Sequence, residues 1–245
     1  MDVKKKYHKK FLKTYISYIV FIIATISVAI LSYIFVQSEW SYVLIFSLLF
    51  LLLAMSYRFK KSLYLIIHES YIENIKEDVM DPIELNDQID MISIQRKLLK
   101  DGYDLTYTGN DYVVLTKIVK DAYIRKIFQH HILYVAMIAF DDKATFYQQK
   151  VDDIINEIQF KSQTEDKKRI DRLLISQYKP IKTFNDQERQ RVNEIIFIKT
   201  DKHIVSTVNI GIVESPHIAL MLASKTYRPS SYYQLHIDTI LSSLK

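Results

Sequence analysis

Four side chains are the candidates for acid–base or metal chemistry in this sequence: His131, His217, Asp111 and Asp186. Histidine titrates near neutral pH and binds metals through its ring nitrogens, so two converging histidines could share a metal or move a proton. His131 and His217 each open an apolar run, however, where a histidine often satisfies a backbone carbonyl, and no H-E-x-x-H or similar ligand spacing accompanies them. We therefore expect structural roles, no metal and no cofactor.

The two aspartates end a pattern that occurs twice. Residues 103–111 read YDLTYTGND and residues 178–186 read YKPIKTFND, with Tyr, Thr, Asn and Asp at the same spacing. Turns and helix N-termini select Thr, Asn and Asp, because their short side chains hydrogen-bond to nearby backbone groups. The pattern therefore indicates repeated architecture rather than a catalytic motif.

The composition excludes several classes of site. The chain of 245 residues has no cysteine, which rules out disulfides, thiolate zinc sites and thiol nucleophiles. Only Gly102, Gly109 and Gly211 occur, whereas a loop that cradles phosphate needs several glycines close together. A nuclease that combines an aspartate with a Glu-x-Lys strand lacks its second carboxylate here, because the strand after Asp111 reads VVLTKI.

The positive charge of the chain is confined to one end. The net charge is +5, but residues 1–61 hold nine Lys and Arg against two acidic residues, a net +7. The other 24 basic and 26 acidic residues give residues 62–245 a net charge of −2. We expect no nucleic acid partner, since the larger part of the chain lacks the field that attracts a polyanion.

Two long uncharged runs near the N-terminus predict a transmembrane hairpin. Residues 14–36 and 40–57 carry no charge, and a helix of about 20 residues spans the roughly 30 Å hydrocarbon core. Three residues separate the runs, so the helices must be antiparallel neighbours. One alternative is a cleaved signal peptide, but the first run is too long for one and a second run follows it directly. The other is a buried hairpin in a soluble protein, which the flanking cations disfavour.

Basic residues flank both runs, whereas the connection between them holds only Glu39 as a charged residue. By the positive-inside rule both termini are cytoplasmic, and the expected location is the plasma membrane of a bacterium. We expect the flanking cations to contact the anionic headgroups of the lipid bilayer. These residues are Lys4, Lys5, Lys6, Lys9, Lys10, Lys13, Arg58, Lys60 and Lys61.

Residues 62–160 are expected to form a first cytoplasmic α+β unit. Its start, 62–75, continues the second helix or forms a short strand. Asp81, followed by Pro82 and Glu84, predicts the start of a helix that ends near Gly102. The further elements expected are a β-hairpin turning at Gly109-Asn110, a buried strand over 131–140 and an amphipathic helix carrying Tyr147, Val151, Ile154, Ile155 and Ile158.

Residues 161–245 are expected to repeat this order as a second unit. Ser162 with Glu165 predicts a capping box that opens a helix through Leu174, and Asn185 with Glu188 predicts another short helix. Strands are expected in EIIFIKT, HIVSTVNIGIV and HIALMLAS, and a last helix from Ser231. Because residues 131–158 also align without gaps on 217–244, we expect two copies of a helix–strands–helix unit.

The predicted fold class is membrane-anchored α+β. A basic cytoplasmic segment, 1–13, precedes the hairpin region, 14–61, and the cytoplasmic units follow. The expected function is that of a membrane-tethered interaction, scaffold or regulatory protein without catalytic activity, working with a protein partner or as a homo-oligomer. Two alternatives stay open: a membrane-associated hydrolase or nuclease with a site around His131 and His217, and an accessory subunit of a transport complex.

Overall fold

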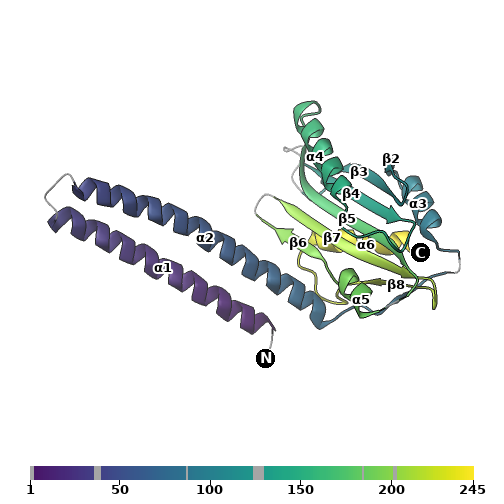
Figure 1. The fold of residues 1–245 in the computed structure, drawn as a ribbon, viewed down its shortest axis with the longest axis horizontal. Coiled ribbons are helices and arrows are strands. Elements are labelled where there is room, and N and C mark those ends of the chain that lie inside the picture. The colour runs from purple at the N-terminus through teal and green to yellow at the C-terminus, as the bar shows by residue number, and fades with distance from the viewer. Residues whose placement is uncertain (1–2, 36–39, 87, 124–129, 184, 201–202) are drawn as a thin grey trace. The chain divides into compact units, whose positions relative to one another are not determined.

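The computed structural model describes residues 3–35, 40–86, 88–123, 130–183, 185–200 and 203–245. The chain divides into two compact units, Met1–Asn74 and Ile75–Lys245, which are drawn in Figure 1. Glu39 and the rest of the connection between the two predicted spans lie outside the described residues.

The first unit is an antiparallel pair of long helices, α1 (Val3–Phe35) and α2 (Trp40–Glu77). Tyr18 donates a hydrogen bond to Ser56 Oγ at 2.8 Å, and Lys10 Nζ lies 2.7 Å from Glu69 Oε2. Both helices are long and apolar enough to cross a membrane, and most of their apolar side chains are exposed. Residues 62–75 continue the second helix, which was the first of the two alternatives expected for them.

The second unit contains one mixed sheet of eight strands in the order β1-β8-β7-β5-β4-β3-β2, with β6 also paired to β7. Strands β4, β5 and β7 run parallel to one another, and the other pairings are antiparallel. The strands are β1 (Ile83–Glu84), β2 (Asp104–Thr108), β3 (Tyr112–Lys120), β4 (His130–Ala139), β5 (Arg169–Ile181), β6 (Ile196–Lys199), β7 (Ile204–Val213) and β8 (Ile218–Met221).

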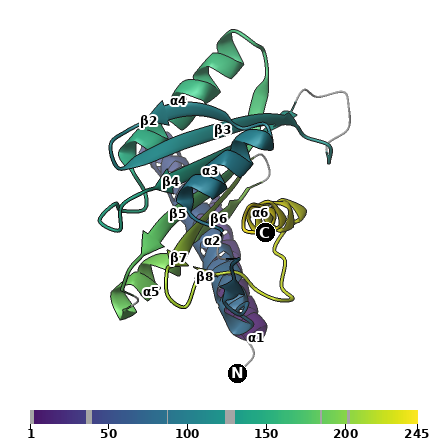
Figure 2. The same cartoon turned by 90° about the vertical axis from the view of Figure 1, so that its right-hand side faces the viewer.

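Four helices cover the two faces of this sheet: α3 (Met91–Lys100), α4 (Gln149–Thr164), α5 (Asp186–Val192) and α6 (Ser231–Ser243). Successive residues of a strand point to opposite faces. Odd-numbered residues of the parallel strands, such as Leu133 and Ile175, pack against α4. Even-numbered residues face α6, and α3 lies beside α6 (Figure 2). The chain is therefore α+β, with a core on each side of one sheet.

The helix predicted through residues 162–174 is wrong, because α4 runs to Thr164 and β5 then begins at Arg169. Ile170, Leu173 and Leu174 have the spacing of a helix face, which misled the prediction. Strand β5 lies between two parallel neighbours and is buried on both faces, so it carries no alternation of apolar and polar residues. The predicted boundary at residue 160 falls inside α4, and β4 and β5 pair along most of their length.

The helix predicted to start at Asp81 is also wrong. Ile83 and Glu84 form β1 instead, paired with β8, and Asp81 lies 2.8 Å from Lys225. The helix begins at Met91, where Asp90 and Ser93 form a reciprocal capping box. Its predicted end is confirmed, because the N–H of Gly102, at φ 84°, donates to Leu99 in a left-handed helix termination.

Most other predicted elements are confirmed: the β2–β3 hairpin, the buried strand β4, helix α4, the short helix capped by Asn185, strands β6, β7 and β8, and the C-terminal helix. The matched segments differ in structure, however. Leu98 and Leu99 lie in helix α3, whereas Leu173 and Leu174 lie in strand β5. The predicted repeat of a helix–strands–helix unit therefore does not hold at this offset.

Candidate functional site

The structure does not bring His131 and His217 together. His131 is the second residue of β4 and pairs with Lys120 on one neighbour and Ile170 on the other. His217 lies in the turn between β7 and β8, directly before the first residue of β8, and its Nε2 donates to the carbonyl oxygen of Asn86 at 2.9 Å. Because β4 and β7 run in the same direction, the two histidines lie at opposite edges of the sheet.

The two predicted aspartates lie in a turn and at a helix start. Asp111 is in the β2–β3 turn, where its carbonyl oxygen accepts a hydrogen bond from Phe140 N at 2.8 Å. Asp186 is the first residue of α5, next to Asn185, whose Oδ1 accepts from Glu188 N at 2.9 Å. Within the described part of the chain, no three His, Asp or Glu side chains are grouped so as to hold a metal ion.

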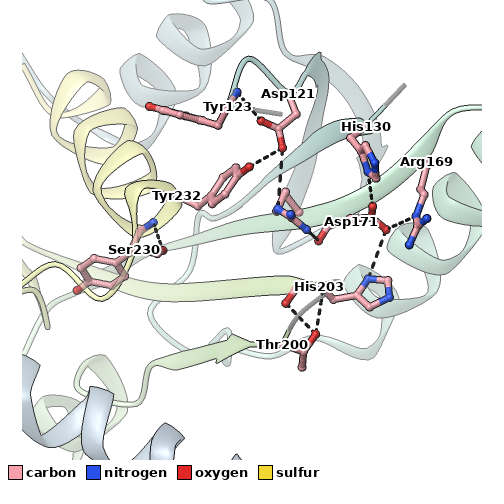
Figure 3. A network of polar contacts seen from close by, with 11 residues as sticks. Asp121, Tyr123, His130, Arg169, Asp171, Thr200, His203, Ser230 and Tyr232 are labelled. Carbon is pink, nitrogen blue, oxygen red and sulfur yellow. Dashed lines mark hydrogen bonds and ion pairs between the residues drawn. The ribbon is translucent and has the colours of Figure 1, made fainter. Parts of the chain in front are cut away.

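A different set of polar side chains converges at the edge of the sheet where β4, β5 and β7 begin (Figure 3). We call it the amino-edge cluster. Its members are Asp121, His130, Arg169, Asp171, Arg172, His203 and Tyr232. They come from the end of β3, the starts of β4 and β5, the residue before β7 and helix α6, so parallel pairing of three strands assembles the cluster.

Asp171 is the centre of one half of this cluster, and its side chain is only 2% exposed. His130 Nδ1 lies 2.5 Å from one carboxylate oxygen. Arg169 Nε donates to the other oxygen at 2.9 Å, and His203 Nδ1 lies 3.7 Å from it. A buried carboxylate is tolerated only when paired in this way, and here it fixes the orientation of three basic side chains.

Asp121 is the centre of the other half and is also buried. It accepts hydrogen bonds from the Tyr232 hydroxyl at 2.6 Å and from Tyr123 N at 2.9 Å. Arg172 connects the halves, because its Nε lies 3.9 Å from Asp121 while its Nη1 donates to the Asp171 carbonyl oxygen at 3.1 Å. Its guanidinium also lies over the Tyr232 ring, 5.0 Å from the centroid. Burial raises the pKa of Tyr232, and the Asp121 carboxylate raises it further.

A cavity of about 590 Å³ opens beside Asp171. Lys167, Lys168, Arg169 and His203 line it, and Asp171 supplies the one carboxylate among the lining residues that the structure describes. Arg169 binds Asp171 through Nε and has a half-exposed side chain, so its terminal nitrogens are available to a ligand. A guanidinium held in this way suits a carboxylate or phosphate oxygen. We call this space the cationic cavity.

A serine–histidine network on the other face of the sheet has no access to solvent. His236 on α6 lies 3.0 Å from Ser176 Oγ and 2.8 Å from Ser206 Oγ, and all three side chains are buried. Burial lowers the pKa of His236 to about 3, so the ring is neutral at physiological pH. A nucleophile needs a substrate within reach, and this network instead fastens α6 to β5 and β7.

Comparison with known protein families, with characterised proteins and with solved structures gives no match, so the site is interpreted from its own geometry. The sequence contains one signal for it. Arg169, Asp171 and Arg172 place three charges at the start of a mostly apolar segment, 169–181. With that segment interpreted as a helix, the three charges do not point to a sheet edge. If the segment is interpreted as a strand, the three charges lie at its N-terminal end, beside the starts of the neighbouring parallel strands.

Proposed function

We propose that this chain is a membrane-tethered interaction protein without catalytic activity. The hairpin of α1 and α2 anchors it, and residues 75–245 bind an anionic group of a protein partner in the cationic cavity. One observation carries the proposal: two helices long and apolar enough to span a bilayer keep their apolar side chains exposed, among them Phe35 at 77% and Phe50 at 75%. Such surface is stable only when lipid or another apolar phase covers it.

The polar groups of the two helices also suit a bilayer. Several hydroxyls within the predicted spans donate to a carbonyl oxygen four residues earlier on their own helix: Thr25 to Phe21, Ser32 to Val28, Ser47 to Val43 and Ser56 to Leu52, at distances of 2.6–2.8 Å. In hydrocarbon an unsatisfied hydroxyl is costly, and this internal bond removes the cost. Thr164 in α4 and Thr239 in α6 make the same bond, so the pattern is compatible with a bilayer and the exposed apolar surface carries the assignment.

The geometry of the hairpin narrows the expected headgroup contacts. If Thr14 and Tyr57 mark the hydrocarbon boundary, the headgroup layer extends about 5–8 Å beyond them. At about 1.5 Å per residue, Lys9, Lys10, Lys13, Arg58, Lys60 and Lys61 fall within or at the border of that layer. Lys4, Lys5 and Lys6 lie about 12–15 Å away and act only through longer-range attraction. Both termini are expected on the cytoplasmic side.

Binding of simple anions to the full chain in lipid nanodiscs tests the interaction half of the proposal. Inorganic phosphate and acetate are titrated while the signals of histidine side chains are followed by NMR. Saturable shifts at His203 are expected, and Arg169→Gln should weaken binding at least tenfold, because the guanidinium contact is lost. Arg189→Gln, on helix α5, is the matched control and should leave the affinity unchanged. Equal loss in both variants would contradict binding in the cationic cavity.

A membrane-associated hydrolase is the second candidate, favoured by one observation. Asp171 lies 3.7 Å from Nδ1 of His203, a mostly exposed side chain at the wall of the cavity. This carboxylate–histidine arrangement can orient a general base. Turnover of p-nitrophenyl phosphate or p-nitrophenyl acetate by the full chain, abolished by His203→Gln, would favour the hydrolase. Absence of turnover, together with anion binding, supports the interaction protein.

A further inference from the structure

A second cavity, of about 630 Å³, lies between helix α4 and strands β5, β6 and β7. It shares only Gln159 with the lining of the cationic cavity. Its lining is mostly apolar at one end, and we call it the apolar cavity. The apolar residues are Val151 and Ile155 on α4, Leu173 and Ile175 on β5, Ile196 and Ile198 on β6, and Val205 on β7.

The other end of the apolar cavity is polar and uncharged. Gln177 forms it, and Thr207 lies between this end and the apolar part, since it is paired with Ile175 and Ile196 across the sheet. Both polar side chains are almost fully buried. Gln177 Oε1 accepts a hydrogen bond from Tyr147 N at 2.6 Å, which orients the amide. The cavity therefore has buried hydrogen-bonding groups in its wall, in the protein environment in which such a bond contributes most to specificity.

Asn209 lies behind this polar end, opposite Gln177 in the β5–β7 pairing. Its side chain is fully buried, and its Nδ2 donates to the carbonyl oxygens of Arg191 and Glu194 at 2.8 and 2.9 Å. Its Oδ1 has no hydrogen-bond partner among the described residues. Exchanging the amide oxygen and nitrogen would set the oxygen against two carbonyls, so the acceptor stays unsatisfied, which is unusual for a buried amide.

Tyr147 closes the polar end. Its backbone has φ 61°, a left-handed conformation that a bulky residue adopts only when its surroundings hold it there. Two contacts hold it: its N–H donates to Gln177, and its hydroxyl donates to the Glu194 carbonyl oxygen at 2.7 Å. Asn209 Nδ2 lies 3.3 Å from the same hydroxyl. Tyr147 thus lines the cavity in a strained conformation, and Asn209, which is not one of the described lining residues, contacts it from behind.

We propose that the apolar cavity binds a small neutral molecule with an apolar body and a polar head that hydrogen-bonds to Gln177 and Thr207. The volume falls in the usual range of ligand sites, roughly 300–1,000 Å³. Among the described residues, no Lys or Arg lines the cavity, and Asp152 is the one charged residue of its rim. An anion therefore finds no counter-charge there, unlike in the cationic cavity.

Two probes with the same ring and different heads test this inference: benzamide, which is neutral, and benzoate, which is anionic. Each is titrated into the full chain in lipid nanodiscs, with isoleucine methyl groups observed by NMR. Saturable shifts are expected for Ile155, Ile175 and Ile196 with benzamide. Benzoate should shift the same three isoleucine signals with an affinity at least tenfold weaker, and its binding in the cationic cavity is read separately at His203. Absence of saturable shifts with benzamide, or equal affinity for the two probes, would overturn the inference.

Two variants localise the binding. Ile198→Glu places a charge at the exposed rim of the cavity and should weaken benzamide binding at least tenfold, whereas Ile118→Glu, an equally exposed strand isoleucine elsewhere, should not. Thr207→Val keeps the shape of the side chain and removes its hydroxyl, so it should reduce the preference for benzamide over benzoate. Equal weakening by the two glutamates would contradict the assigned site. Neither result depends on anion binding in the cationic cavity.

Discussion

At the scale of single residues, the buried carboxylates of Asp121 and Asp171 stabilise the amino-edge cluster. Asp171 compensates His130, Arg169 and His203, so replacing it by asparagine leaves these basic groups beside a neutral amide. We expect Asp171→Asn to lower the free energy of unfolding by about 1–3 kcal/mol, because buried hydrogen bonds of a charged group are lost while Arg169 and His203 remain half-exposed and screened by solvent. The measurement is the thermal unfolding of the full chain in nanodiscs.

The control for this prediction is an acidic residue of the same region that is exposed. Asp166 lies 3.0 Å from Lys168, and both side chains are more than 40% exposed. Asp166→Asn should change stability by less than about 1 kcal/mol, because solvent screens such a pair. Equal effects of the two substitutions would show that Asp171 does not organise the cluster.

The buried His236 should make the stability of the folded chain depend on pH. Burial lowers its pKa to about 3, whereas the unfolded chain has the ordinary value of 6.5. Between these values the unfolded chain binds a proton that the folded chain does not, so acidification favours unfolding. The stability is complete above pH 6.5 and falls by about 1.4 kcal/mol per pH unit as the pH drops toward 3.

The test of this linkage compares the pH slope of the melting temperature in the wild type and in His236→Gln. Glutamine can still hydrogen-bond to Ser176 and Ser206 but does not titrate, so its slope between pH 6 and pH 4.5 should be smaller. Identical slopes would mean that the acid sensitivity arises elsewhere in the chain.

At the scale of elements, the sequence offers both Asp81 and Asp90 as the N-cap of one helix. Asp90 accepts a hydrogen bond from Ser93 N at 2.7 Å and caps α3, while Asp81 lies in an exposed ion pair with Lys225. Asp90→Ala should therefore cost about 1 kcal/mol of stability, and Asp81→Ala less than about 0.5 kcal/mol. Thermal unfolding of both variants checks the difference, and the reverse order would contradict the position of the helix start.

Elements fixed by local residues could be predicted, and elements fixed by distant partners could not. The turn at Gly109-Asn110, the left-handed Gly102 and the Asn185 cap depend on their immediate neighbours, and the sequence alone locates them. Strand β1 exists because β8, far away in the sequence, offers an edge on which Ile83 pairs with Ala219 and Glu84 with Ile218, and no local signal records this pairing. A strand buried on both faces lacks the alternation of apolar and polar residues, so the sequence pattern does not identify β5 as a strand.

The same distinction between local and distant contacts explains why the sequence does not predict the candidate site. His131, His217, Asp111 and Asp186 were prominent in the sequence because of their spacing, yet pairing of the strands distributes them between two edges of the sheet. Asp121 and Asp171 stand 50 positions apart and meet through Arg172 only once β3, β4 and β5 are aligned. A prediction of the site therefore requires the correct assignment of β5 as a strand.

At the scale of the whole molecule, the central claim is that the hairpin of α1 and α2 places residues 75–245 in the cytoplasm. Because the chain has no cysteine, single cysteines can be introduced one at a time and labelled selectively. Ser38, in the connection between the helices, and Lys143, an exposed residue of the domain, report on the two sides of the membrane.

The deciding measurement is maleimide labelling of Ser38→Cys and Lys143→Cys in intact bacterial cells, with a reagent that does not cross the inner membrane. We expect Ser38→Cys to react in intact cells and Lys143→Cys to react only after the cells are opened. Both proteins should stay in the membrane after washing at alkaline pH. Labelling of Lys143→Cys in intact cells, or release of the chain by the alkaline wash, would contradict the central claim.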